Sequence, residues 1–350
     1  MKAPGKRYDD ATIETLLLDL VDTHPNDLVR VVAARIPTTR PTVLLRVRKL
    51  ILGGYLTSSG GSRPRYARGG SVRRSFRYDT AGLDEDSVWR RDVRPLLEGL
   101  SANVIALCQH GLTEMVNNAV DHSGAESVTV FVDRSPNRLA MVVDDDGIGI
   151  FRKIATHLEL PDDRLALFEL AKGKLTTDPA RHTGEGVFFS SRMFDSFQIV
   201  SGALTFDHDQ QEPDDVLTEA EVDLKGTSVV MIVSPTSRRT IKQVFDEFSS
   251  GPDDYAFAKT IVPVRLAAFG DENLVSRSQA RRVMQRVERF RTVVLDFAGV
   301  DTIGQAFADE IFRVFADAHP NVELVPMHPV VAVQHMIRRA QDLRAPLFDG

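Results

Sequence analysis

The stretch that most constrains the fold is Leu112–His122, LTEMVNNAVDH, whose apolar residues recur at the spacing of an amphipathic helix. Glu114, Asn118 and Asp121 stand at positions i, i+4 and i+7, which places them on one face of that predicted helix. A carboxylate and an amide on one stripe can serve a metal ion and a water molecule together. A solvated helix face is the alternative, and this stretch by itself leaves both interpretations open.

Three glycine-containing segments follow this helix in order. Met141–Ile150, MVVDDDGIGI, predicts a strand that ends in acids and then in a tight turn whose backbone comes close to another group. His182–Phe188, HTGEGVF, places a second glycine pair before an apolar stretch that could open a helix, where backbone N–H groups bind phosphate. Lys225–Val233, KGTSVVMIV, predicts a Gly-Thr step at the beginning of a strand.

The order E-x-x-x-N, D-x-G-x-G, G-x-G and G-T resembles the GHKL superfamily of ATP-binding domains, over about residues 89–235. That superfamily includes type II topoisomerases, the heat-shock chaperone of that class, mismatch-repair ATPases, histidine kinases and anti-sigma-factor kinases. The resemblance implies that ATP and Mg²⁺ are bound. It also implies a Bergerat-type α/β sandwich, in which helices cover one face of a mixed, mostly antiparallel sheet.

The resemblance assigns a role to each motif residue. Asn118 matches the Mg²⁺ ligand, and Asp145 matches the aspartate that accepts a hydrogen bond from the adenine amino group. Glu114 stands where topoisomerase-like and anti-sigma-kinase members have Glu and histidine kinases usually have Asn, so it is the expected general base. Lys172 and Lys174 could cover the phosphates, or they could be two solvated lysines. The other expected nucleotide contacts are Asp121, Gly147, Gly149, Lys174, Gly184, Gly186 and Thr227.

The N-terminal segment has a charge balance of its own. Residues 1–78 contain 15 Lys or Arg residues against 6 Asp or Glu residues, whereas the whole chain has a net charge of −6. Three short predicted helices and the Arg-rich hairpin YLTSSGGSRPRYARG make residues 1–75 resemble a winged helix-turn-helix with DNA as its partner. A winged helix used for protein contacts is the alternative. The residues expected to face DNA are Thr38, Thr39, Arg40, Thr42, Arg46, Arg63 and Arg65.

The C-terminal segment predicts a third domain. Residues 69–84 are expected to be a linker with one short strand, and the ATP-binding domain is expected over residues 84–240. In residues 256–350, strands alternate with helices, which predicts a small α/β domain with parallel pairing and right-handed crossovers. The whole chain is thus expected to combine α+β and α/β domains.

The run VVLDFAGVDTIGQAFADEIFRVF resembles the STAS-like domain of unknown function found beside ATPases of this type. STAS domains of anti-sigma antagonists carry a phosphorylatable serine after a D-F-x-x-V stretch. Gln305 and Ala306 stand at that place here, and Thr302 is the nearby hydroxyl, so the phospho-acceptor is not expected. We therefore predict an interaction or gating module that binds a protein partner.

Length and composition narrow the class of protein. The length of 350 residues exceeds one ordinary core, so two or three domains are expected. No apolar run approaches the length of a membrane span, and the N-terminus lacks an apolar core followed by a cleavage site. The single cysteine, Cys108, excludes an internal disulfide and a cysteine-based metal cluster. We therefore expect a cytoplasmic protein without a membrane partner.

Three functions fit these features. In the first, ATP binding and slow hydrolysis change how the winged helix binds DNA and so regulate transcription. An ATP-linked homodimer is a further expectation of this first function. In the second, the chain is a protein serine/threonine kinase of the anti-sigma type. In the third, it is a sensor that binds ATP without turnover. A histidine kinase ranks last, because no phospho-acceptor helix is visible and His122 is expected to be structural.

Overall fold

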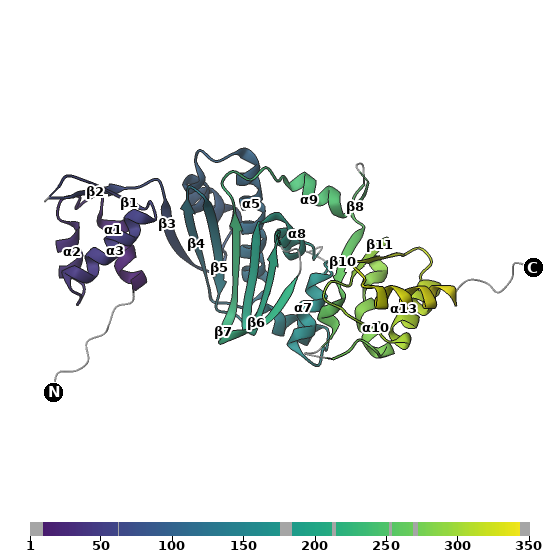
Figure 1. The fold of residues 1–350 in the computed structure, drawn as a ribbon. Coiled ribbons are helices and arrows are strands. Elements are labelled where there is room, and N and C mark those ends of the chain that lie inside the picture. Colours follow the sequence, from purple (N-terminus) through teal and green to yellow (C-terminus); the bar gives the residue numbers. More distant parts are fainter. Residues whose placement is uncertain are drawn as a thin grey trace, which may run out of the picture.

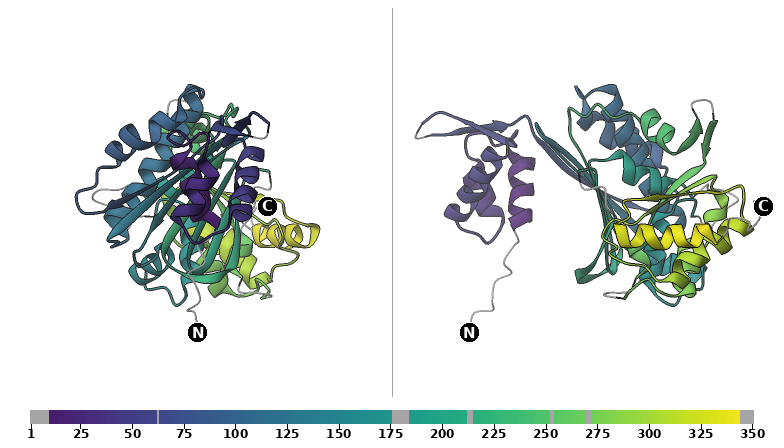
Figure 2. Two further views of the ribbon diagram at one scale, coloured as in Figure 1. Left: turned by 90° about the vertical axis from the view of Figure 1, so that its left-hand side faces the viewer. Right: turned by 45° about the vertical axis from the view of Figure 1, so that its right-hand side comes forward.

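The computed structural model of the chain describes residues 10–61, 63–175, 184–211, 215–251, 254–268 and 272–343. They form three units in a row: helices with a hairpin at one end, a large sheet in the middle, and an α/β unit at the other end (Figure 1). The view turned by 45° shows that a single extended segment joins the first unit to the sheet (Figure 2). The limits predicted for the three domains remain predictions.

The N-terminal unit contains the three helices and the hairpin that the sequence predicts. Its elements are α1 (Asp10–Leu20), α2 (Leu28–Arg35), α3 (Arg40–Leu52), β1 (Leu56–Ser59) and β2 (Arg65–Arg68). Helix α3 begins after Thr39, whose side-chain oxygen accepts a hydrogen bond from the backbone N–H of Thr42 at 3.4 Å. The unit has a hydrophobic core of its own, which includes Ile13, Leu17, Leu28, Val32, Val43, Val47 and Leu56.

The central sheet has five strands in the order β3-β4-β5-β7-β6, and every neighbouring pair is antiparallel. The strands are β3 (Val72–Asp79), β4 (Ser127–Ser135), β5 (Arg138–Asp145), β6 (Ser196–Asp209) and β7 (Val216–Val233). Strand β3 pairs with β4 along its whole length, so the one short strand expected within residues 69–84 is an edge strand of eight residues. Charged side chains are common on edge strands, and VRRSFRYD contains three arginines.

Helices pack on one face of this sheet, as the α/β arrangement predicted (Figure 1). The helices in contact with its strands are α5 (Ala102–Asn117), α6 (Ile150–His157) and α8 (Gly186–Met193). Helices α7 (Asp163–Ala171) and α9 (Ile241–Phe248) pack against these helices, and the short α4 (Glu85–Ser87) precedes α5. Helix α5 continues directly into the π-helical turn η3 (Asn118–His122). This change of helical pitch in the middle of the first motif decides which of its side chains face inward.

The C-terminal unit is an α/β unit whose sheet has three parallel strands, so the predicted parallel pairing is confirmed. The strands are β10 (Lys259–Pro263), β11 (Thr292–Asp296) and β12 (Glu323–Met327), and the helices are α10 (Arg277–Met284), α11 (Gln305–Asp309), α12 (Ala316–Ala318) and α13 (Val331–Asp342). The short strands β8 (Ser249–Gly251) and β9 (Asp254–Phe257) lead into it. Its core is continuous with that of the central sheet, because Phe257 packs against Phe188 at 4.7 Å and Phe290 at 5.1 Å between ring centroids.

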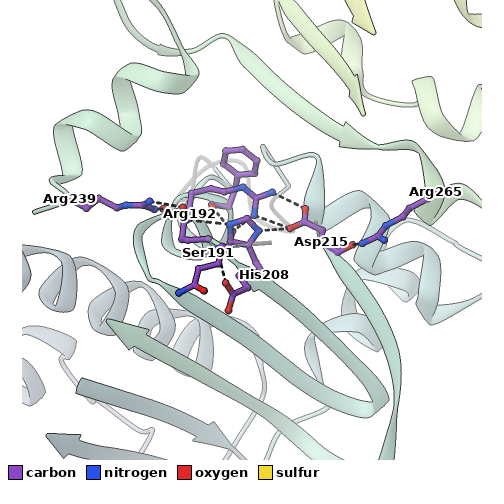
Figure 3. Close-up of polar contacts among 10 residues, drawn as sticks. Ser191, Arg192, His208, Asp215, Arg239 and Arg265 are labelled. Atoms are coloured by element: carbon purple, nitrogen blue, oxygen red, sulfur yellow. Dashed lines mark hydrogen bonds and ion pairs between the residues drawn. The ribbon is translucent and has the colours of Figure 1, made fainter. Parts of the chain in front are cut away.

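A buried polar network ties helix α8 to the β6–β7 hairpin (Figure 3). Asp215 accepts two hydrogen bonds from the Arg192 guanidinium, at 3.1 and 2.8 Å, and lies 2.8 Å from Nδ1 of His208. The backbone carbonyl of Asp215 also accepts a hydrogen bond from Arg265, which belongs to the C-terminal part of the chain.

Within the described residues, none of the helices combines the length and apolar character needed to cross a bilayer.

Candidate functional site

A cavity of about 300 Å³ lies where α5, the turn after β5, the beginning of α8 and strand β7 meet. Its walls contain residues from all four sequence motifs. The predicted site residues that line it are Glu114, Asn118, Asp145, Gly149, Gly184, Gly186 and Thr227. Segments separated by more than one hundred residues along the chain thus contribute to one cavity of a size suited to a small ligand.

Asp145 is held at the cavity wall by backbone groups. Its Oδ1 accepts a hydrogen bond from the backbone N–H of Gly147 at 2.9 Å. Burial raises the pKa of the Asp145 carboxyl. Backbone hydrogen bonds from Gly147 and Thr227 lower this pKa and so offset part of the effect of burial. The side-chain hydroxyl of Thr227 accepts a hydrogen bond from the backbone N–H of Ile150 at 3.0 Å, so the last motif also fixes the beginning of α6.

The glycines of the D-x-G-x-G turn are required by close packing. Gly149 has φ +87°, and a Cβ at this position would lie 2.6 Å from Oγ of Ser201. A Cβ on Gly147 would overlap the backbone carbonyl of Ser123. Gly147 is not among the residues that line the cavity, and its N–H instead orients the Asp145 carboxylate.

The second glycine pair lies beside the acid of the first motif. A Cβ on Gly186 would overlap Oε2 of Glu114, so only glycine leaves that carboxylate at the cavity wall. Gly184 has φ +74°, and its carbonyl accepts a hydrogen bond from the backbone N–H of Leu175 at 3.0 Å. The carboxylate of Glu114 therefore faces the first turn of α8, the segment in which backbone N–H groups are expected to bind phosphate.

Asp121 does not share the face of Glu114 and Asn118. It is exposed, and it is not among the residues that line the cavity. The sequence prediction assumed an α-helix throughout, whereas residues 118–122 form a π-helical turn, which has more residues per turn. As a result, His122 follows Asn118 on the cavity wall in place of Asp121.

The two lysines expected to cover the phosphates are directed to the C-terminal unit. Lys172 is 2% exposed, and its ammonium lies 2.7 Å from Oε1 of Glu169. Lys174 places its ammonium 4.7 Å from the centre of the Phe290 ring and donates to the carbonyl of Arg289 at 3.4 Å. Neither lysine lines the cavity, because the packing of the C-terminal unit, which local sequence does not reveal, draws both toward it.

Lys153 is a cavity residue that the sequence analysis missed. Among the described residues that line the cavity, it is the one with a cationic side chain. Its ammonium donates a hydrogen bond to the backbone carbonyl of His122, and burial lowers its pKa. The sequence feature that could have indicated Lys153 is its position four residues after Gly149, on the helix that begins at the D-x-G-x-G turn.

The donor groups fit Mg²⁺ held together with a phosphate better than a metal held by protein alone. Among the described residues, no group of three or more His, Cys, Asp or Glu side chains could hold a metal ion. Mg²⁺ keeps several water ligands and binds through few protein groups plus substrate phosphates. One amide oxygen from Asn118 at the wall of the cavity satisfies that requirement.

Comparisons with known proteins bear on two parts of the chain. Residues 279–333 match the family described as a STAS-like domain of unknown function. The C-terminal unit therefore contains a STAS-like domain, as the sequence predicted. A stretch of 80 residues is 32% identical to the signal transduction histidine-protein kinase/phosphatase UhpB of Salmonella typhimurium. That stretch is 23% of this chain and 15% of UhpB, so the similarity is distant and partial, and it points to the ATPase region of a histidine kinase.

Within the STAS-like unit, the place of the expected phospho-acceptor falls at the beginning of a helix. Gln305 is the first residue of α11, and Ala306 follows it. Thr302 lies in the preceding loop and is exposed. The same loop lines a cleft between this unit and the β6–β7 hairpin, so the hydroxyl of Thr302 is accessible at the boundary of the two units.

The residues expected to face DNA divide into two groups. Thr39, Arg40, Arg63 and Arg65 are exposed, whereas Thr38 and Thr42 are half-buried. Arg46 differs from the prediction, because its side chain is only 18% exposed and its guanidinium lies 4.0 Å from the carboxylate of Glu14 on α1. The carboxylate of Glu14 attracts Arg46 inward, an interaction between distant segments that helical periodicity could not show.

Proposed function

We propose that this chain is a regulator that binds ATP together with Mg²⁺ in the cavity and changes its binding to DNA in response. The observation that supports ATP binding best is the convergence of four separate motifs on one cavity, through the side chains or backbone of Glu114, Asn118, Asp145, Gly186 and Thr227. The distant similarity to a histidine kinase supports the same ligand. In this proposal the cavity belongs to a GHKL-type ATP-binding domain, and the N-terminal unit is a winged helix.

Each cavity residue has a proposed role. Asp145 accepts a hydrogen bond from the adenine amino group, and Asn118 ligates Mg²⁺. The backbone between Gly184 and Gly186 binds phosphate, with Lys153 adding positive charge to the same cavity. Glu114 accepts a proton from a water molecule or a protein hydroxyl, which is the role of a general base.

Lys153→Gln is expected to weaken ATP binding about tenfold, because a hydrogen bond to a charged group contributes about 1.5–3 kcal/mol. Isothermal titration of ATP into the intact chain measures this effect. Arg152→Gln is the matched control, since Arg152 is the preceding residue on the same helix, is exposed and does not line the cavity. Equal affinities of the Lys153→Gln variant and the wild type would remove Lys153 from the site.

DNA binding by the N-terminal unit is tested by a mobility-shift assay with and without ATP and Mg²⁺. The proposal rests on the exposed Arg40, Arg63 and Arg65, which stand on α3 and on or beside the hairpin strand β2. We expect retention of DNA at low salt and a change in its affinity when ATP is added. The change should disappear in an Asn118→Ala variant, and absence of DNA binding at low salt under both conditions would contradict the proposal.

The destination of the γ-phosphate separates this proposal from the alternatives. Slow release of inorganic phosphate that Glu114→Gln abolishes indicates an ATPase. Radiolabelled phosphate on a protein side chain indicates a serine/threonine kinase, and Thr302 is the hydroxyl to examine first within the chain because it is exposed. Binding without either product indicates a sensor that does not turn ATP over.

A further inference from the structure

One short segment, Lys172–Leu175, connects the cavity with the STAS-like unit. At its far end, Leu175 lines the cavity and donates its backbone N–H to the carbonyl of Gly184 at 3.0 Å. At its near end, it follows directly from α7, whose residue Leu170 also lines the cavity. This hydrogen bond and a close backbone contact link the segment to Gly184, one of the two glycines proposed to bind phosphate.

The near end of the segment is anchored by buried charges from both units. The ammonium of Lys172 lies 2.7 Å from Oε1 of Glu169, and it donates to the carbonyl oxygens of Arg282 at 2.9 Å and Gln285 at 3.0 Å. The other carboxylate oxygen of Glu169 accepts a hydrogen bond from Arg286 at 3.2 Å. Lys172 and Glu169 are each 2% exposed or less, so these charges depend on one another for compensation.

The backbone of the segment is bound to the same unit. Arg286 donates its second guanidinium N–H to the carbonyl of Lys174 at 2.8 Å, and Thr260 on β10 donates to the carbonyl of Lys172 at 2.6 Å. Gly173 has φ +76°, and a Cβ there would lie 2.7 Å from the ring of Phe257. The segment thus has no room to shift without breaking contacts made by the C-terminal part of the chain.

Arg286 itself has an unusual backbone conformation. Its φ is +65°, in the left-handed region that residues other than glycine rarely adopt. Such strain persists where surrounding contacts impose it, and it is common at functional sites. Here the two bonds of the guanidinium, to Glu169 and to Lys174, hold the residue in place.

We propose that the STAS-like unit controls the geometry of the nucleotide cavity through Glu169, Lys172 and Arg286, with Arg286 as the positioning residue. This inference rests on the proposed function. A partner that binds the STAS-like unit and displaces Arg286 releases the Lys172–Leu175 segment and weakens ATP binding. Because coupling between two sites is reciprocal, bound ATP changes the affinity of the STAS-like unit for that partner by the same factor.

The test compares Arg286→Ala with Arg281→Ala in the full chain. Arg281 lies nearby on α10 and pairs with Glu310 at 2.6 Å, away from the segment, so its loss is a matched control. Titration with ATP and Mg²⁺ should show an affinity on the order of tenfold lower for Arg286→Ala and unchanged for Arg281→Ala. Arg286→Lys, which keeps the charge near Glu169, should recover part of the affinity.

A second variant separates positioning from simple loss of stability. Arg286→Gly removes the same guanidinium but also relieves the left-handed backbone, so its thermal unfolding temperature without nucleotide should exceed that of Arg286→Ala. Positioning predicts that both variants lose ATP affinity equally. If affinity instead follows the unfolding temperature, or if Arg286→Ala binds ATP as the wild type does, the inference is overturned. Failure of the wild type to bind ATP would overturn the proposed function instead.

Discussion

Asp145→Asn is expected to lower ATP affinity on the order of 100-fold, since a lost charge-assisted hydrogen bond together with an unpaired buried donor costs about 3 kcal/mol. The geometry gives the reason. One carboxylate oxygen of Asp145 accepts the N–H of Gly147, and the proposal assigns a further acceptor position of this carboxylate to the adenine amino group. An asparagine that keeps its oxygen on Gly147 presents its own NH₂ group to that amino group, so two donors face each other.

The same substitution is expected to leave the fold intact or to stabilise it. Burial raises the pKa of the Asp145 carboxyl, so the ionised form costs stability at neutral pH, and a neutral amide removes that cost. The free energy of unfolding in urea should therefore be equal to that of the wild type or larger. Asp144→Asn is the control, because Asp144 is exposed and does not line the cavity. Wild-type ATP affinity in the Asp145→Asn variant would exclude this aspartate from adenine binding.

Asp215→Asn is expected to lower the free energy of unfolding by about 3–5 kcal/mol, the usual cost of removing one partner of a buried ion pair. The change leaves the guanidinium of Arg192, a residue that is 9% exposed, without its counter-charge at the centre of the network in Figure 3. Asp209→Asn on the same hairpin is the control, since Asp209 is exposed and should change stability by less than about 0.5 kcal/mol. Equal urea midpoints for the two variants would contradict the role given to the network.

The same network gives the wild-type chain a pH dependence. Burial lowers the pKa of His208 below its ordinary value of 6.5, so the unfolded chain takes up a proton near that pH before the folded chain does. Burial by itself would raise the pKa of Asp215, but Arg192 and His208 outweigh it and lower the pKa below 3.8. Stability is therefore expected to fall as the pH decreases below about 6.5, and further below about 4, in urea titrations at fixed temperature.

Seven of the residues that local sequence singled out line one cavity, and they come from short motifs with their own turn chemistry. Gly149 and Gly186 had to be glycines for reasons visible in the structure, namely a positive φ at the first and overlap with Glu114 at the second. In the folded chain, Asn118 and Asp145 line the same cavity. The three parallel strands of the C-terminal unit were predictable for a similar reason, because strands and helices alternate there.

The residues whose surroundings were predicted incorrectly depend on contacts between distant segments. Asp121 leaves the cavity face because α5 changes to a π-helical turn, which the apolar spacing did not indicate. Lys174 is drawn to Phe290 and Arg46 to Glu14, each far away in the sequence. Lys153 was missed for the converse reason, since nothing in its local sequence separates it from a solvated lysine until the fold places it in the cavity.

The central claim, that this cavity binds ATP through Mg²⁺ and Asn118, is tested most directly by titrating ATP into the intact chain with and without Mg²⁺. For the wild type we predict saturable binding of one ATP per chain, with affinity that increases when Mg²⁺ is added. For Asn118→Ala we predict that Mg²⁺ no longer increases the affinity. Absence of saturable binding by the wild type, or the same response to Mg²⁺ in Asn118→Ala, would contradict the claim.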